Sequence, residues 1–210
     1  MITLKLLDTV PQIEDKVNSA ISEQINLLLF QKQSTLLNSA KNMASTWISS
    51  QPEMLSLQSS SSFSLAGQFG LYAGSGSSVV NAIKNSITNS VSVSFKKFSK
   101  KLVGGLEINF QPKNFINLLT LPEGIVNYER GSLPWLEWLL TKGDSIIVTS
   151  YIYYPSTGLG RSGLGNMTAG GSFRVPPEFS GMDSDNFVTR ALIGPNQEKE
   201  LTDLFRKILT

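Results

Sequence analysis

The segment Lys96 to Lys101 reads KKFSKK and holds the densest charge of the sequence. Its lysines are Lys96, Lys97, Lys100 and Lys101. Phe95 precedes the segment and Phe98 lies inside it, and basic residues interleaved with aromatic rings can bind the phosphate backbone of a nucleic acid. The solvated end of a β-hairpin has the same composition. Two interpretations therefore stay open: a contact with DNA, or a solvent-exposed turn.

A second pattern is a Gly-x-Gly-x-x-Gly motif that begins at Gly158 and follows a predicted strand, as in the dinucleotide-binding fingerprint. That fingerprint must open a helix. Here the motif runs into further glycines up to Gly171 and has no phosphate-loop lysine, so nucleotide binding is not expected. We interpret residues 155–172 as a mobile glycine-rich arm that becomes ordered on a partner. Arg161 is the single charge of this arm, so we expect it to anchor the arm to a carboxylate of the next subunit.

The residue types that most often carry catalysis are missing, because the sequence has no histidine and no cysteine. A Ser-His-Asp triad, a thiol nucleophile and a zinc site built from histidine or cysteine are thereby excluded. The carboxylates are scattered, and no spacing pairs two of them as general acid and base. We expect no catalytic residue, no metal and no cofactor. An enzyme that uses only Asp, Glu or Lys is the remaining rival.

Length, net charge and apolar runs limit the classes of protein to which this chain can belong. The 210 residues suffice for a core without disulfides, and the net charge of +2 does not by itself indicate a nucleic-acid-binding protein. No apolar run approaches the ~20 residues of a membrane span, so we expect no membrane partner. The sequence predicts a single α+β domain over residues 1–210, with a polar loop region near 56–78.

The elements that must position these residues begin with a long helix. Alternation over Ile2 to Leu7 predicts a short strand. From Gln12 to Gln51 the apolar residues follow a helical period without glycine or proline. Pro52 ends this helix, which either runs unbroken or bends near Gln33 to Thr35. A helix of this length exceeds what a small core requires, so we expect it to pack along a neighbouring chain as well.

Two strands carry the lysine segment. Val91, Val93 and Phe95 alternate with serines, which predicts that Val91 to Lys101 pairs with Leu106 to Phe110 across a turn at Gly104-Gly105. The preceding segment, 78–90, has a helical apolar spacing that its asparagines and serines weaken.

An aromatic helix is predicted from Leu133 to Leu140. Trp135, Trp138 and Leu139 fall at i, i+3 and i+4 and share one face. This face either belongs to an ordinary core helix or is covered by a neighbouring subunit, since aromatic residues are enriched at interfaces. On the second interpretation the interface residues are Leu133, Trp135, Trp138 and Leu139.

The next strand, Ser145 to Tyr154, is apolar or aromatic on both faces, so it is either central in a sheet or covered by another chain. Tyr151 and Tyr153 are its candidate interface residues. Two short helices follow, one capped by Asp183 to Asp185 and the last by Asn196. The predicted fold is α+β: a long N-terminal helix packed on a mainly antiparallel sheet, short C-terminal helices and an extended glycine-rich loop.

A longer pattern covers the last third of the chain: LPWLEWLL-x-x-GD, a strand, a glycine-arginine loop, and a segment ending in DN-x-VTRAL. The residues of this pattern are Leu133 to Leu140, Gly143-Asp144, Gly160 to Gly163, Phe173 to Pro176, Glu178, Gly181 and Asp185 to Leu192. It resembles tailed-phage virion proteins of the minor tail, tail-completion and neck classes. The short strand and long helix at the start of the chain are also similar to the head–tail joining class.

The resemblance implies a structural subunit of the head–tail junction, a tail-completion, tail-terminator or neck protein assembled as a ring, with a homo-hexamer as the expected size. Its implied partners are further copies of itself, the head–tail connector, tail tube or sheath proteins, and genomic DNA in the channel. Its implied location is the virion, after assembly in the host cytoplasm. Arg161 and Arg190 join the candidate interface residues. Two alternatives stay open: a baseplate or distal tail protein, and a nucleic-acid-contacting module that uses Lys96 to Lys101.

Overall fold

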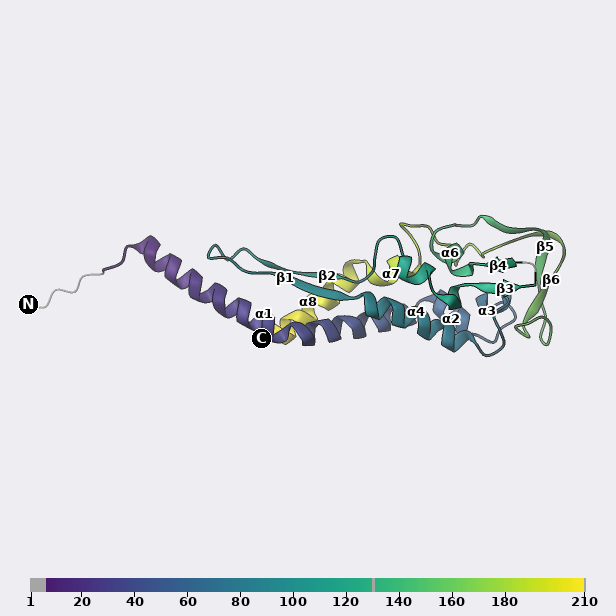
Figure 1. Ribbon diagram of the computed structural model, residues 1–210, viewed down its shortest axis with the longest axis horizontal. Coiled ribbons are helices and arrows are strands. Elements are labelled where there is room, and N and C mark those ends of the chain that lie inside the picture. The colour runs from purple at the N-terminus through teal and green to yellow at the C-terminus, as the bar shows by residue number, and fades with distance from the viewer. Residues whose placement is uncertain (1–6, 130, 210) are drawn as a thin grey trace, which may run out of the picture.

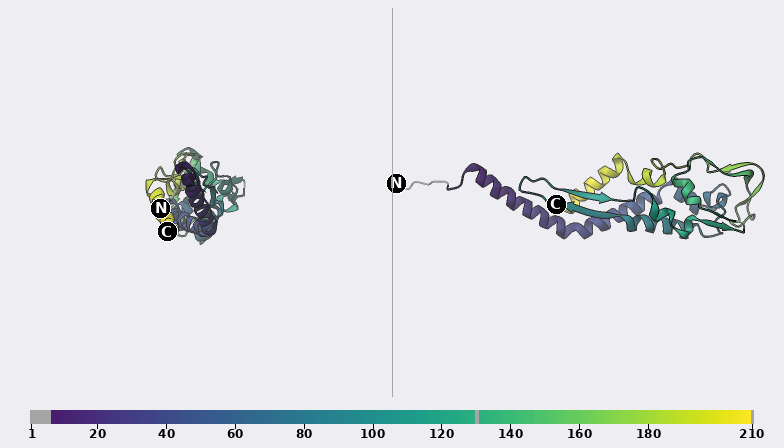
Figure 2. Two further views of the ribbon diagram at one scale, coloured as in Figure 1. Left: turned by 90° about the vertical axis from the view of Figure 1, so that its left-hand side faces the viewer. Right: turned by 45° about the horizontal axis from the view of Figure 1, so that its top comes forward.

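A computed structural model gives the fold of residues 7–129 and 131–209, which is elongated (Figure 1). The helix α1 (Val10–Ser49) begins at one end, and the hairpin of β5 (Ile146–Pro155) and β6 (Gly165–Arg174) forms the other. Seen along its length, the molecule has a narrow cross-section (Figure 2). The predicted α+β class with a long N-terminal helix is confirmed. The strand expected over 2–7 lies, except for Leu7, outside the described residues.

The helix α1 runs unbroken for 40 residues, about 60 Å at 1.5 Å per residue. Its start is set by Thr9, whose backbone N–H and hydroxyl both donate to Gln12 Oε1, at 2.8 and 3.0 Å. Pro11 in the first turn costs no hydrogen bond. Pro52 begins the next helix instead of continuing α1, so the predicted end is confirmed.

Shorter helices form a group with the second half of α1, some packed on α1 itself and others on one another. They are α2 (Pro52–Gln58), α3 (Leu65–Gln68), α4 (Gly76–Ser90), α5 (Ile116–Leu119), α6 (Trp135–Leu140), α7 (Phe187–Leu192) and α8 (Pro195–Leu209), with a 3₁₀ turn at Pro122–Gly124. The segment of α4 is helical despite its asparagines and serines, since its regularly spaced apolar residues Ile83 and Ile87 are fully buried. From α1, Leu36, Ala40 and Ile48 enter the same core.

The strands of the described residues form three separate antiparallel hairpins instead of one sheet. They are β1 (Ser92–Lys96) with β2 (Gly105–Asn109), β3 (Val126–Tyr128) with β4 (Gly131–Leu133), and β5 with β6. The antiparallel direction agrees with the prediction. The helix α1, however, packs on other helices and on β1, since no continuous sheet is formed by the described strands.

The polar stretch near 56–78 contains the end of α2, all of α3 and the start of α4. Its hydroxyl groups satisfy backbone N–H groups: Ser56 Oγ accepts from Leu65 N at 2.9 Å, and Ser64 Oγ accepts from Gly67 N at 3.2 Å. Serine side chains therefore shape the connection locally, as they commonly do at turns and helix starts.

The caps of the two C-terminal helices differ from the prediction. Asn186, not Asp183 to Asp185, caps α7, because its Oδ1 accepts from the N–H groups of both Val188 and Thr189. The helix α8 begins at Pro195, whose fixed backbone suits a first turn. Asn196 is consequently inside the helix and is not its cap.

Candidate functional site

The aromatic helix α6 belongs to the core. Trp135 is fully buried, its ring centroid is 5.3 Å from that of Phe69, and its Nε1 donates to Glu123 O at 3.0 Å. Leu139 is also fully buried, so neither residue offers surface to a neighbouring subunit. The core interpretation of this helix is therefore the correct one for Trp135 and Leu139.

The other two residues expected on that face lie at the edge of the core. Leu133 is in β4, where it pairs with Val126, so the helix begins two residues later than predicted. Leu133 and Trp138 are half-buried and pack against the core from outside. Their role in a subunit interface stays a prediction.

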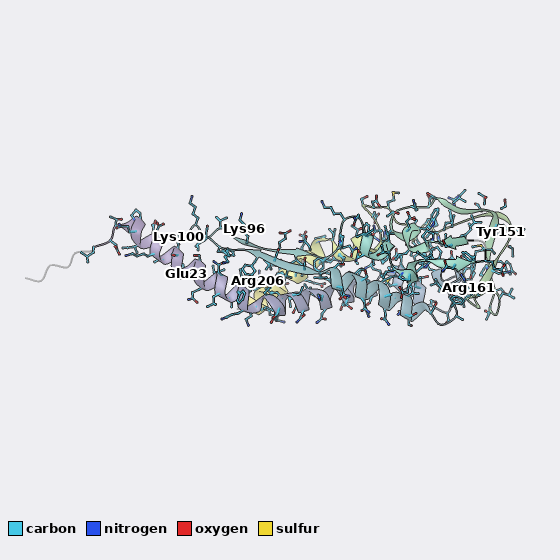
Figure 3. The ribbon with its side chains drawn as sticks, in the orientation of Figure 1. Glu23, Lys96, Lys100, Tyr151, Arg161 and Arg206 are labelled. Atoms are coloured by element: carbon cyan, nitrogen blue, oxygen red, sulfur yellow. The ribbon has the colours of Figure 1, made fainter. Side chains whose placement is uncertain are left out.

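The β5–β6 hairpin is a two-stranded ribbon at the end of the molecule opposite the start of α1 (Figure 1). The interpretation of β5 as a central strand is therefore wrong. A register shift between Thr149 and Tyr151 breaks the alternation, and Ser150 there has a φ of 65°. Beyond it, Tyr151, Ile152 and Tyr154 are 47%, 50% and 57% exposed. Figure 3 labels Tyr151 at this end. The ribbon thus presents apolar and aromatic side chains to solvent.

The glycine-rich segment is part of this ribbon and packs on its own chain. Residues 165–172 belong to β6, and residues 156–164 close on themselves. Ser156 N donates to Leu164 O at 3.0 Å, and Gly158 N donates to Gly163 O at 2.8 Å. A Cβ at Gly160 would lie 2.0 Å from the Gly165 carbonyl oxygen, so the glycine permits this close turn. These hydrogen bonds are local and the segment supplies them itself, while its mobility in the free subunit stays a prediction.

Tyr153 fastens the ribbon to the body. Its hydroxyl lies 2.9 Å from the carbonyl oxygens of both Ser62 and Leu164. Gly67 and Gly165 leave room for this ring, since a Cβ on them would lie 2.4 and 2.5 Å from Tyr153 Oη. Burial raises the pKa of the Tyr153 phenol further above neutral pH, so its hydroxyl stays protonated and can donate a hydrogen bond. Tyr153 therefore acts within the subunit.

Arg161 docks on its own chain, and its contact with a carboxylate of the next subunit stays a prediction. Its Nε donates to Gly70 O and its Nη1 donates to Asn127 O, both at 2.7 Å. The guanidinium also lies over the rings of Tyr72 and Tyr128, with its Cζ 4.8 and 5.0 Å from their centroids. Burial raises the pKa of Tyr128, and Arg161 opposes that shift. Arg161 thus joins the turn between β5 and β6 to the loop after α3 and to strand β3, and its carbonyl partners have no sequence signature that could have identified them.

Arg190 is likewise engaged inside the chain. It binds the fully buried carboxylate of Glu53 through Nη2 and the exposed carboxylate of Asp185 through Nη1 at 2.9 Å. Burial raises the pKa of Glu53, although its own backbone hydrogen bond and Arg190 pull that pKa down. Arg190 is 38% exposed at its side chain, so a further contact across an interface stays a prediction. No sequence pattern points to Glu53, which is separated from Arg190 by 137 residues.

The lysine segment forms the tip of the β1–β2 hairpin. Its tight turn covers Ser99 to Leu102, where Leu102 N donates to Ser99 O at 2.8 Å and Leu102 has a φ of 55°. The predicted pairing of the two strands is confirmed. The turn predicted at Gly104-Gly105 is wrong, because Gly104 lies against the Phe98 ring and Gly105 already pairs with Lys96.

A further apolar surface lies on the first half of α1, which projects beyond the body (Figures 1 and 2). Val10, Val17 and Ile21 recur at spacings of seven and four, share one face and are 69%, 50% and 41% exposed. The buried residues Ser22 and Leu29 fall on a different face. We call Val10, Val17 and Ile21 the α1 stripe.

Other kinds of site find little support in the described residues. No helix among them is long and apolar enough to cross a membrane, and no group of three or more carboxylates there could hold a metal ion. A hollow of about 420 Å³ between β2 and α7 is lined mainly by apolar side chains such as Phe110, Phe115 and Leu192. No protein family, curated protein or solved structure matches this chain. Only the residues of this chain therefore bear on its function.

Proposed function

We propose that this protein is a structural subunit of a tailed-phage virion, which closes or joins the tail at the head–tail junction as a ring of identical copies. The proposal rests on the apolar surface that the described chain leaves exposed at both ends of its long axis. The α1 stripe is at one end, and Tyr151, Ile152 and Tyr154 are at the other. Contiguous exposed apolar surface commonly marks a site of protein contact.

The arrangement favours a head-to-tail assembly. A symmetric contact between two copies uses the same surface on both of them. The two apolar surfaces of this chain differ, so each can instead contact another part of a second copy. Such heterologous contacts close into a ring or continue as a filament. The resemblance of residues 133–192 to tail-completion and neck proteins selects the ring.

Solution mass tests the assembly part of the proposal. Light scattering at micromolar concentration should give a fixed multiple of the 22.9 kDa subunit. Val17→Asp combined with Ile21→Asp should lower the mass to that of the subunit without changing its helix content. The reason is that these side chains are exposed in the single chain, so a charge there meets water until another copy covers it.

Ser34→Asp is the matched control, because Ser34 is an exposed polar residue of the same helix. It should leave the mass unchanged. A wild-type protein that stays at 22.9 kDa over the whole concentration range would contradict self-assembly. Equal assembly of the wild type and the double variant would exclude the α1 stripe as the contact.

A further inference from the structure

The β1–β2 hairpin concentrates positive charge at one place on the molecule. Between Ser92 and Asn109 it has four lysines and one carboxylate, that of Glu107, and hence a net charge of +3. The whole chain carries +2, so the remainder is slightly negative. All four lysines are exposed, and within the described part of the chain none of them forms an ion pair.

The charges of this hairpin are not neutralised across its strands. Lys96 pairs with Gly105, which has no side chain, while Glu107 lies opposite Ser94. Figure 3 shows Lys96 and Lys100 at the projecting end, with Glu23 of α1 and Arg206 of α8 in the same region. Arg206 pairs with Asp203 of its own helix at 3.5 Å, so it adds no net charge beside the lysines of the tip.

The backbone beneath the lysines is held firmly by α1. Asn26 binds the Phe98 backbone twice: its Nδ2 donates to Phe98 O at 3.0 Å, and its Oδ1 accepts from Phe98 N at 2.8 Å. Gln33 Nε2 donates to Val93 O at 3.2 Å. A fixed backbone lowers the ordering entropy lost when the lysines bind a ligand.

The aromatic residues of the segment are not free to stack on bases. The Phe98 ring lies over Gly104, where an added Cβ would be 2.6 Å from Phe98 Cγ and Cδ2. Phe95 faces inward next to the buried strand position Val93 and is itself half-buried. Single-stranded nucleic acids are usually held by exposed aromatic rings. The hairpin therefore offers charge without a stacking surface.

We propose that the tip of the β1–β2 hairpin binds the phosphate backbone of double-stranded nucleic acid through Lys96, Lys97, Lys100 and Lys101. A protein partner fits less well, because protein interfaces are depleted in lysine and enriched in arginine, and the hairpin has no arginine. Lysine acts as a mobile point charge that suits phosphates without a fixed geometry. This inference does not depend on the virion role proposed above.

The test is the salt dependence of binding to a DNA duplex of about 30 base pairs, followed by fluorescence anisotropy. If the four lysines neutralise about four phosphates, the logarithm of the association constant should fall with the logarithm of the salt concentration with a slope of about −3.5. Replacing all four lysines by Gln should bring the slope close to zero and weaken binding at about 50 mM salt by ~100-fold or more.

A second variant controls for net charge. Gln at Lys41, Lys84, Lys113 and Lys199 removes the same four charges from the body, and among the described residues none of these lysines forms an ion pair. It should keep the wild-type slope and stay within about threefold of the wild-type affinity. Equal loss of binding in both variants would show that net charge alone attracts DNA, and would overturn the hairpin site.

A single-stranded probe of the same length tests the binding mode. We expect it to bind no more tightly than the duplex. Tighter binding that persists at high salt would indicate base stacking and contradict the proposal. No binding of the wild type to duplex at low salt would also overturn it, while leaving the ring proposal untouched. Circular dichroism of each variant separates lost binding from lost folding.

Discussion

Arg161 joins the turn between β5 and β6 to the loop after α3 and to strand β3 through one guanidinium. It donates to two backbone carbonyls, of Gly70 and Asn127, and lies over the rings of Tyr72 and Tyr128. The turn that connects β5 to β6 therefore depends on this residue for its position on the body.

Arg161→Ala should lower the free energy of unfolding by about 2–3 kcal/mol, because it removes two charge-assisted hydrogen bonds and two ring contacts. Arg161→Lys should lose most of the same stabilisation, since an ammonium group cannot bind both carbonyls and also stack on the tyrosine rings. Arg174→Ala is the control. Arg174 has a 3.5 Å surface ion pair with Asp144, so its loss should cost less than about 0.5 kcal/mol. Urea denaturation that does not separate Arg161→Ala from this control would contradict the account.

Glu53 makes stability depend on pH. Burial raises its pKa in the folded state, so the folded protein holds this proton more tightly than the unfolded chain does. Its stabilising contribution is therefore complete in acid, below the unfolded pKa, and is lost as the pH rises through the raised folded pKa. Glu53→Gln does not titrate. Its free energy of unfolding relative to wild type should increase between about pH 4 and pH 7. If the free energy of unfolding of the variant relative to wild type is constant or falls over that range, Arg190 lowers the pKa of Glu53 by more than burial raises it.

At the scale of elements, Asn186 connects three of them. Its Oδ1 caps α7, and its Nδ2 donates to Leu140 O at 3.2 Å and to Met182 O at 2.9 Å. Asn186 is completely buried. The end of α6, the turn at Met182 that precedes α7, and the start of α7 thus share one side chain.

Asn186→Ala should lower the free energy of unfolding by about 2–4 kcal/mol, because buried backbone groups lose their partners. Asn114→Ala is the control. Asn114 accepts from Ile116 N at 3.3 Å in an exposed position, so its loss should cost less than about 1 kcal/mol. Thermal unfolding of the two variants compares them directly, and equal midpoints would contradict the role of Asn186.

The elements that the sequence predicts correctly are those whose apolar residues repeat at a regular spacing. The α1 helix, the α4 spacing and the β1–β2 pairing follow from apolar residues repeating locally. What it missed depends on partners far apart in the sequence. Arg161 is 91 residues from Gly70. The glycines near it predict a mobile arm, because glycine indicates conformational freedom but does not reveal the turn that uses this freedom.

Burial within one chain excludes some candidate interface residues but does not show which of the exposed ones contact another subunit. Burial removes Trp135 and Leu139 from the candidate interface, whereas Tyr151 keeps about half of its surface exposed. A buried core helix and a helix at an interface have the same apolar sequence pattern, so the sequence alone could not separate them.

At the scale of the whole molecule, the elongated form places three distinct surfaces apart. The α1 stripe and the tip of the β1–β2 hairpin lie toward one end, and the exposed side chains of the β5–β6 ribbon lie at the other (Figures 1 and 3). In a ring of parallel copies, each kind of surface would form its own layer along the ring axis. The apolar layers would join subunits, and the cationic layer would remain for a polyanion.

The position of the chain on a tailed virion tests the central claim most directly. Electron microscopy of particles labelled with an antibody against this protein should show the label at the junction between head and tail. Label at the distal end of the tail would instead support a baseplate or distal tail protein. Absence of the chain from purified virions would contradict a structural role in the particle altogether.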